Sequence, residues 1–144
     1  MDQYLEFIGN HYLLCLALVI ISFLLIQDLL ESAFNQFEGL SPLLAVTKMN
    51  SADSVVVDVR APHEFTKGHI ENAINIPVEK FSDQIDSLEK YKQQPIIVAC
   101  QTGNRANPAC KALVKAGFDH VFNITGGMQS WEDYNLPLKS SSTK

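Results

Sequence analysis

Basic residues are missing from the first third of the chain. No lysine or arginine precedes Lys48, whereas the acidic residues Asp2 and Glu6 stand near the start. A cleaved signal peptide begins with a basic stretch and ends at a small-residue cleavage site. Neither is found around the apolar run of this region. For the chain as a whole, a net charge of −5 argues against nucleic acid as the main partner.

Cysteine is also scarce. The 144 residues hold three cysteines, Cys15, Cys100 and Cys110, which are far apart and form no CxxC pair. An odd count with such spacing predicts neither a disulfide scaffold nor a zinc site. The sequence also lacks a Walker phosphate loop and a dinucleotide fingerprint, so we expect no metal and no cofactor. The length allows one globular domain, and 47% hydrophobic residues suffice for its core.

One long apolar run is present near the N-terminus. From Tyr12 to Ile26 the run is interrupted by Ser22 alone. A helix over residues 7–26 is about 30 Å long, which is the thickness of a bilayer core. The run therefore predicts an uncleaved, single-pass transmembrane anchor. A hairpin or a helix that docks on a partner protein is the alternative.

The charges that flank this run predict its orientation. Lysine and arginine concentrate on the cytoplasmic side of a membrane. Acidic residues precede the run and the first lysines follow it, so we expect an outside N-terminus and a cytoplasmic C-terminal part. Residues 27–40 continue a helical pattern as a stalk or a surface-lying helix, and Gly39 ends it. We therefore divide the chain into an anchor with a juxtamembrane helix (1–38), a domain (39–139) and a disordered tail (140–144).

Helices and strands alternate in the predicted domain. The strand over 55–59 is too continuously apolar for a half-exposed sheet, which favours a parallel sheet covered on both faces. The alternation predicts an α/β domain with a central, mostly parallel sheet flanked by helices. The expected helices lie over 42–50 (after an N-cap at Ser41), 78–88 and 106–117 and around Trp131, and the expected strands over 55–59, 73–76, 95–99 and 120–124.

Cys100 stands where the strand over 95–99 meets the helix over 106–117. The loop Gln101-Thr102-Gly103-Asn104-Arg105 lies between them, and Gly103 allows it to turn sharply. Ligands of open α/β sheets bind at the carboxyl ends of strands. Loop N–H groups, a helix N-terminus and the Arg105 guanidinium all favour an anion and the thiolate form of cysteine. The pattern predicts that Cys100 is a nucleophile within an anion cradle made by residues 101–105. The alternative is a buried structural cysteine.

Five separated motifs occur here in the order of a known family. Over about residues 40–139 the chain resembles the rhodanese domain, and its layout is similar to small bacterial membrane-anchored rhodanese-like proteins. The resemblance implies a rhodanese fold at the bacterial inner membrane and a persulfide-forming sulfurtransferase with Cys100 as its catalytic residue. Such an enzyme takes a sulfane sulfur from thiosulfate or a persulfide and passes it to a thiol or cyanide-like acceptor. The motifs are Asp58-Val59-Arg60, Glu64-Phe65 before Gly68-His69-Ile70, Ala73 to Pro77, the Cys100–Arg105 loop, and Gly126-Gly127 before Trp131.

The length of the Cys100 loop distinguishes two branches of that family. Its dual-specificity phosphatases have a loop that is longer by one residue, whereas the six residues from Cys100 to Arg105 have the sulfurtransferase length. A tighter ring of N–H groups suits a terminal persulfide sulfur better than a phosphate. Many thiosulfate-using members carry a basic residue directly after the cysteine. This chain departs from that pattern because it has Gln101 there.

Three further residues line or support the expected site. We interpret Asp58, at the end of a buried strand, as a group that ties down loop backbone. Arg60 either forms an ion pair with Glu64 or Asp58 or faces the site. His69 is expected to satisfy backbone hydrogen bonds, since an ionised cysteine needs no base for sulfur transfer. Cys110 is assigned to the core.

Two functions remain open on the sequence. One is a membrane-tethered sulfurtransferase. The other is a non-catalytic or weakly catalytic adaptor, whose rhodanese fold binds a protein partner at the membrane. The intact Cys100, Gly103 and Arg105 favour the first, since an adaptor needs no anion cradle around a thiol.

Overall fold

The chain consists of two compact units, Met1–Asn35 and Gln36–Lys144. A computed structural model describes residues 7, 9–34 and 37–141. Asp2 and Glu6, on which the predicted orientation depends, and residues 142–144 of the predicted tail lie outside the described residues.

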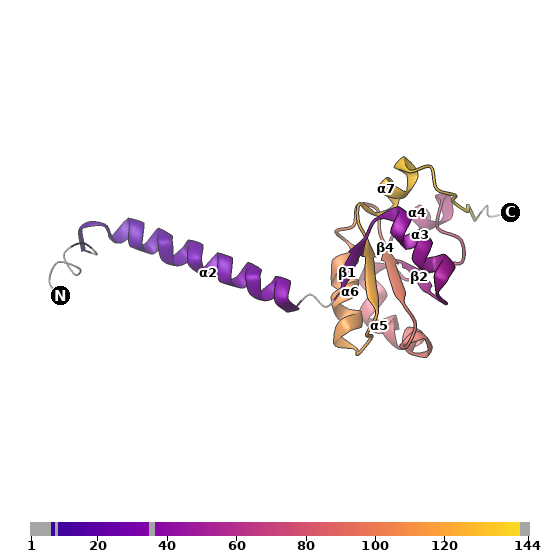
Figure 1. Cartoon of the computed structure of the whole chain (residues 1–144), viewed down its shortest axis with the longest axis horizontal. Coiled ribbons are helices and arrows are strands. Elements are labelled where there is room, and N and C mark those ends of the chain that lie inside the picture. The colour runs from indigo at the N-terminus through magenta and orange to yellow at the C-terminus, as the bar shows by residue number, and fades with distance from the viewer. Residues whose placement is uncertain (1–6, 8, 35–36, 142–144) are drawn as a thin grey trace. The chain divides into compact units, whose positions relative to one another are not determined.

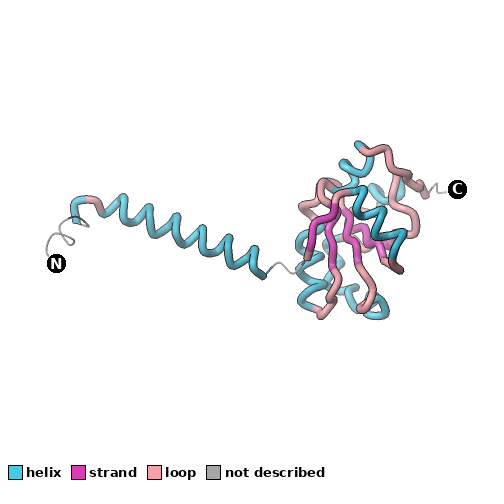
Figure 2. The backbone as a smooth tube through the Cα atoms, in the orientation of Figure 1, coloured by secondary structure: helices cyan, strands magenta, loops and turns pink. Residues whose placement is uncertain are grey.

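Helix α2, Tyr12–Phe34, makes up most of the described part of the first unit (Figure 2). Its stretch Tyr12–Leu30 has a mean hydropathy of 2.6, and no part of that stretch is buried. Length and composition allow this helix to cross a bilayer, a property that it shares with signal sequences. The helical pattern predicted through residue 40 stops earlier, because Glu38–Leu40 forms strand β1.

A five-stranded parallel sheet forms the centre of the second unit (Figure 1). Four of its strands are the ones predicted from the sequence, and all pairs are parallel, which confirms the predicted parallel sheet. The fifth strand, β1, lies at an edge of the sheet. Its residues continue the apolar spacing of the preceding helix, and the helical pattern predicted for them is wrong. The strands are β1 (Glu38–Leu40), β2 (Val55–Asp58), β3 (Ile74–Asn75), β4 (Ile96–Ala99) and β5 (Val121–Ile124), in the spatial order β1-β5-β4-β2-β3.

The helices form two layers, one on each face of the sheet. Alternate residues of a strand point to opposite faces. From β4, Ile96 and Val98 pack in a cluster with residues of α5 and α6, whereas Ile97 and Ala99 pack with residues of α3 and α7. Burial on both faces explains why the central strands are continuously apolar. The helices are α3 (Pro42–Ser51), α4 (Pro62–Lys67), α5 (Phe81–Gln84), α6 (Ala106–Lys115) and α7 (Gly127–Asp133).

The segment between β3 and β4 differs from the single helix predicted over 78–88. It consists of the 3₁₀ turn η1 (Val78–Lys80), the short helix α5 and a second 3₁₀ stretch, η2 (Ile85–Tyr91). The predicted inward residues Phe81 and Leu88 are nevertheless buried. Serine hydroxyls compete with the helical ladder for backbone carbonyls, and the Ser87 hydroxyl donates to the Gln84 carbonyl at 2.6 Å.

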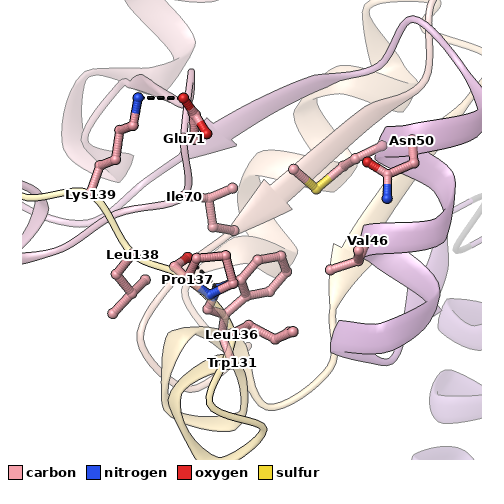
Figure 3. A pocket seen from close by; sticks show the side chains of 10 residues that line it. Val46, Asn50, Ile70, Glu71, Trp131, Leu136, Pro137, Leu138 and Lys139 are labelled. Atoms are coloured by element: carbon pink, nitrogen blue, oxygen red, sulfur yellow. Dashed lines mark hydrogen bonds and ion pairs between the residues drawn. The ribbon is translucent and has the colours of Figure 1, made fainter.

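The C-terminal segment packs back onto the domain. The backbone of Lys139 exchanges two hydrogen bonds with that of His69, both of 2.8 Å, and the Ser141 N–H donates to the Thr66 carbonyl at 3.1 Å. Trp131 is buried, and its indole N–H donates to the Pro137 carbonyl. A cavity of about 370 Å³ opens between this segment and α3 (Figure 3).

Candidate active site

Cys100 directly follows β4, at the carboxyl edge of the sheet, and is fully buried. The Gly103 N–H donates to its Sγ at 3.0 Å. Gly103 adopts a φ of +97°, a conformation that glycine reaches without strain. The sharp turn predicted from Gly103 is thus present, and it aims a backbone donor at the sulfur.

The N-terminal turn of α7 holds the backbone of the Cys100 loop by hydrogen bonds. The Met128 N–H donates to the Cys100 carbonyl at 2.7 Å, and the Gln129 N–H donates to the Gln101 carbonyl at 3.0 Å. Gly127 has a φ of +60°, and a Cβ there would collide with the Cys100 carbonyl oxygen. Glycine is required at position 127 because the two backbones touch.

Asn123 holds the loop from β5, and sequence reasoning missed it. Its Nδ2 donates to the Gly103 carbonyl at 3.2 Å and to Asn107 Oδ1 at 2.9 Å. The available signal was its place as a single amide side chain within an otherwise apolar strand. Such a group needs hydrogen-bond partners when it is buried.

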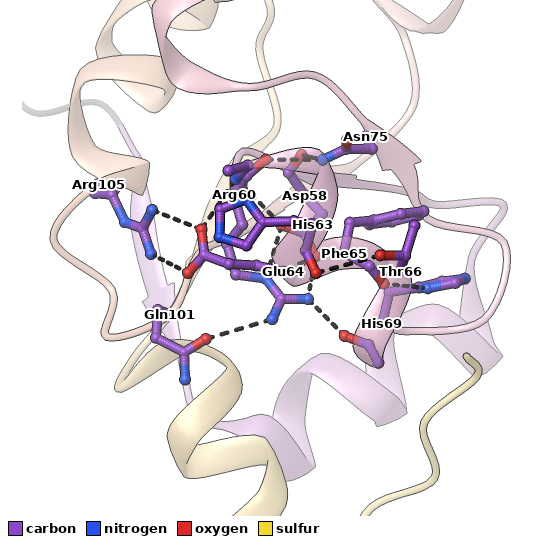
Figure 4. A network of polar contacts seen from close by, with 12 residues as sticks. Asp58, Arg60, His63, Glu64, Phe65, Thr66, His69, Asn75, Gln101 and Arg105 are labelled. Carbon is purple, nitrogen blue, oxygen red and sulfur yellow. Dashed lines mark hydrogen bonds and ion pairs between the residues drawn. The ribbon is translucent and has the colours of Figure 1, made fainter. Parts of the chain in front are cut away.

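Arg60 and Asp58 form a buried ion pair next to the loop (Figure 4). Arg60 Nε lies 3.0 Å from both Asp58 oxygens, and Nη2 lies 2.7 Å from Oδ2. The remaining guanidinium contacts reach the Gly68 carbonyl at 2.7 Å and Gln101 Oε1 at 3.3 Å. Asp58 also accepts from the Arg60 N–H. Arg60 therefore pairs with Asp58 and connects the end of β2 to the Cys100 loop.

Arg105 forms a second, bidentate ion pair with Glu64 of α4. Its Nη1 and Nη2 lie 3.0 and 2.9 Å from the two carboxylate oxygens (Figure 4). Glu64 Oε2 also accepts from the Ala61 N–H at 3.0 Å. The sequence pointed to Arg105 as the cation of the cradle, but it did not reveal Glu64 as the group that this cation contacts.

These contacts shift the acid–base behaviour of both partners. The hydrogen bond from Arg105 is the largest cause that lowers the pKa of Glu64 from 4.5 to about 2, against a smaller opposing effect of burial. The same hydrogen bond raises the pKa of Arg105, and the charges of Glu64, Cys100 and Glu79 add to the rise. Both members of the pair are therefore ionised at neutral pH.

The outer residues of the loop differ from the inner ones in exposure. Thr102 and Asn104 are exposed, whereas Gln101 and Arg105 are half-buried and Gly103 is buried. Residues 101–105 thus surround Cys100 with two solvent-facing polar side chains, one amide bonded to Arg60, and one guanidinium bonded to Glu64.

His69 lies beside this network and has a structural set of contacts. Its Nδ1 donates to the Phe65 carbonyl at 2.8 Å, and its ring stacks on the Phe65 ring with centroids 3.9 Å apart. Asn75, which sequence reasoning also missed, donates to the carbonyls of Asp58 and Arg60. These side chains fix the backbone between β2 and β3.

Cys110 is as buried as Cys100 but lies in the interior of α6. Its Sγ is 3.9 Å from the Phe122 carbonyl, and burial raises the pKa of this thiol to about 12. Among the residues that the structure describes, no group of three or more His, Cys, Asp or Glu side chains is placed to hold a metal ion.

Several known proteins are similar to this chain in sequence and fold. A family model described as a rhodanese-like domain matches residues 41–134. The uncharacterized protein YibN of Escherichia coli K12 is 33% identical over 139 residues, which cover 96% of this chain and 97% of YibN. Thiosulfate sulfurtransferase GlpE of Actinobacillus pleuropneumoniae is 27% identical over 105 residues, covering 73% of this chain and 95% of GlpE.

A solved structure agrees with these sequence matches. The crystal structure of a rhodanese-related protein from Thermoplasma volcanium superimposes with a TM-score of 0.65 at 28% identity, over 71% of this chain and 97% of that one. The family model covers more than half of the chain, and the similarity to the solved structure agrees with it. The chain is therefore a member of the rhodanese family, whose relatives include sulfurtransferases.

Proposed function

We propose that this protein is a membrane-anchored sulfurtransferase that carries a sulfane sulfur as a persulfide on Cys100. The observation that carries the proposal is the hydrogen bond from the Gly103 N–H to Cys100 Sγ at 3.0 Å. A backbone donor aimed at sulfur stabilises the thiolate and, after reaction, the charge on the persulfide. The activity named for the GlpE relative supports the same reaction class.

The reaction consists of two displacements at sulfur. The Cys100 thiolate attacks the sulfane sulfur of a donor, a new S–S bond forms, and the bond to the leaving group breaks with its electron pair. An acceptor nucleophile then attacks the outer sulfur, and Cys100 leaves as a thiolate. Neither step needs a base once Cys100 is ionised. This agrees with the structural contacts of His69.

Access to Cys100 requires movement of the loop side chains, because Cys100 itself is fully buried. The exposed residues Thr102 and Asn104 and the half-buried Gln101 are the loop positions that meet solvent. We assign residues 101–105 to the cradle that receives the donor, and Asp58, Arg60 and His69 to its support.

Two measurements test the proposed activity: the mass of the isolated protein and its rate of sulfur transfer. After reaction with a sulfur donor, the wild-type protein should carry one additional sulfur on Cys100, which cyanide removes as thiocyanate. Cys100→Ser should carry none and should not turn over. Failure of the folded wild-type protein to accept sulfur from any donor would contradict the proposal and favour a rhodanese-fold adaptor.

We assign α2 as the membrane anchor, with the rhodanese domain on the cytoplasmic side. The exposed, apolar stretch Tyr12–Leu30 supports the anchor, and the first basic residue, Lys48, supports the orientation. The protein should remain with membranes after alkaline carbonate extraction, and protease added to spheroplasts should leave the domain intact. Release by carbonate would refute the anchor, and cleavage of the domain would reverse the orientation.

A further inference from the structure

Two guanidinium groups lie beside the Cys100 loop, and each is paired with a carboxylate. Arg60 is bound by Asp58, and both Nη atoms of Arg105 donate to Glu64. Glu79 adds negative charge within range of Arg105. These guanidinium groups therefore provide little net positive charge to an incoming anion, and the Arg105 edge that would grip a sulfonate is already occupied.

Both members of the Arg105–Glu64 pair are charged at neutral pH. The pKa of Glu64 is lowered to about 2, so this carboxylate is ionised throughout the neutral range. An oxoanion that bound Arg105 would have to displace a carboxylate that is itself held by the Ala61 N–H. Competition with an internal anion weakens binding of an external one.

Position 101 adds no charge. The Gln101 side chain is an amide, and its Oε1 is bonded to Arg60 Nη1 at 3.3 Å. An amide at this place offers hydrogen bonds to neutral groups, but it does not offset the charge of an anion. For binding an anion, the loop therefore offers its backbone N–H groups and the guanidinium of Arg105, whose charge is compensated by Glu64.

Gln101 lines a cavity of about 280 Å³. Its wall carries Lys67 and Glu132 in addition to Arg60 and Glu64, and Leu138 contributes apolar surface. Two cations and two carboxylates leave the wall without net charge. The volume is slightly below the range of about 300–1,000 Å³ that is usual for small-molecule sites. This lining suits the organic part of a small thiol better than a dianion.

We propose that the sulfur donor of this protein is a small thiol persulfide, R–S–SH, and that sulfur oxoanions such as thiosulfate are poor donors. The inference rests on the proposed sulfurtransferase function and narrows its substrate class. Thiosulfate carries two negative charges next to the sulfur that is transferred. A thiol persulfide carries at most one charge on its sulfurs, and its leaving group extends into space that the cavity can provide.

The transfer step balances without a further reactant. The Cys100 thiolate attacks the outer sulfur of R–S–SH, the Cys100–sulfur bond forms, and the bond between the two donor sulfurs breaks. The thiol leaves as a thiolate with the electron pair. The transferred sulfur keeps its proton and then loses it to solvent, and no oxidant or reductant is consumed.

The direct test compares two donors on full-length protein in detergent, with the same thiol acceptor. We expect kcat/KM for cysteine persulfide to exceed that for thiosulfate by at least about tenfold, which corresponds to about 1.4 kcal/mol. A kcat/KM for thiosulfate that equals or exceeds that for the persulfide overturns the inference. Sulfur transfer to Cys100 from both donors would still uphold the proposed function, whereas transfer from neither would refute it.

Two variants test the physical cause. Gln101→Arg adds a cation to the loop, and Glu64→Gln removes the carboxylate that occupies Arg105. Each should raise the thiosulfate-to-persulfide ratio of kcat/KM by about fivefold, the effect of one charge interaction at about 4 Å in water. If both ratios stay unchanged in folded protein, charge compensation does not set donor choice and the inference fails. The Glu64 variant alone decides if the Gln101 variant does not fold.

Glu89→Gln is the matched control. It makes the same change in net charge as Glu64→Gln, and it also removes an ion pair, the one with Lys92. Lys92 lies against Gly117, after the C-terminal end of α6, whereas the Cys100 loop precedes the N-terminal end. The donor ratio should stay at the wild-type value. A rise equal to that of Glu64→Gln would show an effect of net charge alone and would overturn the inference.

Discussion

Cys100 and Cys110 lie in the same hydrophobic cluster and are equally buried, yet their surroundings differ. Cys100 stands at the end of a strand, and a backbone N–H lies 3.0 Å from its sulfur. Cys110 stands within a helix, and its sulfur lies 3.9 Å from a carbonyl oxygen. The first contact favours a negative sulfur and the second favours a protonated one.

Burial alone therefore does not determine the surroundings of a cysteine sulfur. Burial removes both sulfur atoms from water, and at Cys110 this desolvation disfavours the thiolate. At Cys110 nothing offsets that effect enough, and the pKa of the thiol rises to about 12. At Cys100 the loop geometry supplies a donor, because Gly103 and Gly127 adopt left-handed conformations and let backbones approach closely.

The largest expected effect is that of Cys100→Ser. Sulfur transfer should fall to background, since an oxygen cannot form a persulfide. The fold should persist because serine preserves the shape of the side chain. Cyanide-dependent release of thiocyanate measures the loss, and circular dichroism checks the fold. Residual turnover above background would place the sulfur elsewhere.

Cys110→Ser should reverse this pattern. We expect a loss of about 1–3 kcal/mol in the free energy of unfolding, because a hydroxyl is buried in an apolar site. Sulfur transfer should continue at a rate near that of the wild type. Denaturant unfolding and the turnover assay measure the two effects. Loss of turnover in a folded variant would indicate a relay between two cysteines.

Arg105→Ala should have a smaller effect on stability, roughly 1 kcal/mol, since the ion pair with Glu64 is partly exposed. Turnover should also decrease, because the loop loses its connection to α4. Arg105→Lys keeps the charge but cannot form the bidentate contact. Its turnover should lie between those of the alanine variant and the wild type. Equal turnover in all three proteins would show that Arg105 does not contribute to the reaction.

Glu64→Gln should change the acid dependence of stability. A carboxyl whose pKa is lower in the folded state stabilises the fold above its unfolded value of 4.5 and loses this contribution as the pH falls towards about 2. The wild type should therefore lose its advantage over the variant between these values. Thermal unfolding at several pH values measures the difference. A constant difference down to the acid end would mean that the pair does not lower the pKa of Glu64.

Removal of residues 1–35 should have the smallest effect on the contrast between the two cysteines. The domain has its own core, and the cut leaves β1 intact, since that strand begins at Glu38. The shortened protein should be soluble and should transfer sulfur at the rate of the full chain in detergent. Aggregation of the shortened protein would show that the first unit contributes to the fold.

Sequence reasoning found the elements whose signals are local. The apolar strands, the Ser41 N-cap and the Gly103 turn follow from adjacent residues, and the structure contains them. The three residues of strand β1 carry too little periodicity to distinguish a strand from a continued helix. The hydroxyl of Ser87 helps explain why the segment after β3 forms 3₁₀ turns.

The missing parts of the site are contacts between distant residues. Glu64 and Arg105 are separated by 41 positions, and so are Arg60 and Gln101. Spacing along the chain cannot show which carboxylate a guanidinium meets, since that depends on how α4 is placed against the loop. Asn123 supports Gly103 from a different strand for the same reason.

Peptide mass spectrometry can show which of the two cysteines carries the transferred sulfur. Trypsin cleaves after Lys92, Arg105 and Lys111, so Cys100 and Cys110 fall in separate peptides. The full-length protein is incubated with cysteine persulfide, its sulfurs are trapped by alkylation, and the peptides are weighed. We expect one added sulfur on the Cys100 peptide and none on the Cys110 peptide. Added sulfur on the Cys110 peptide, or on neither, would contradict this expectation.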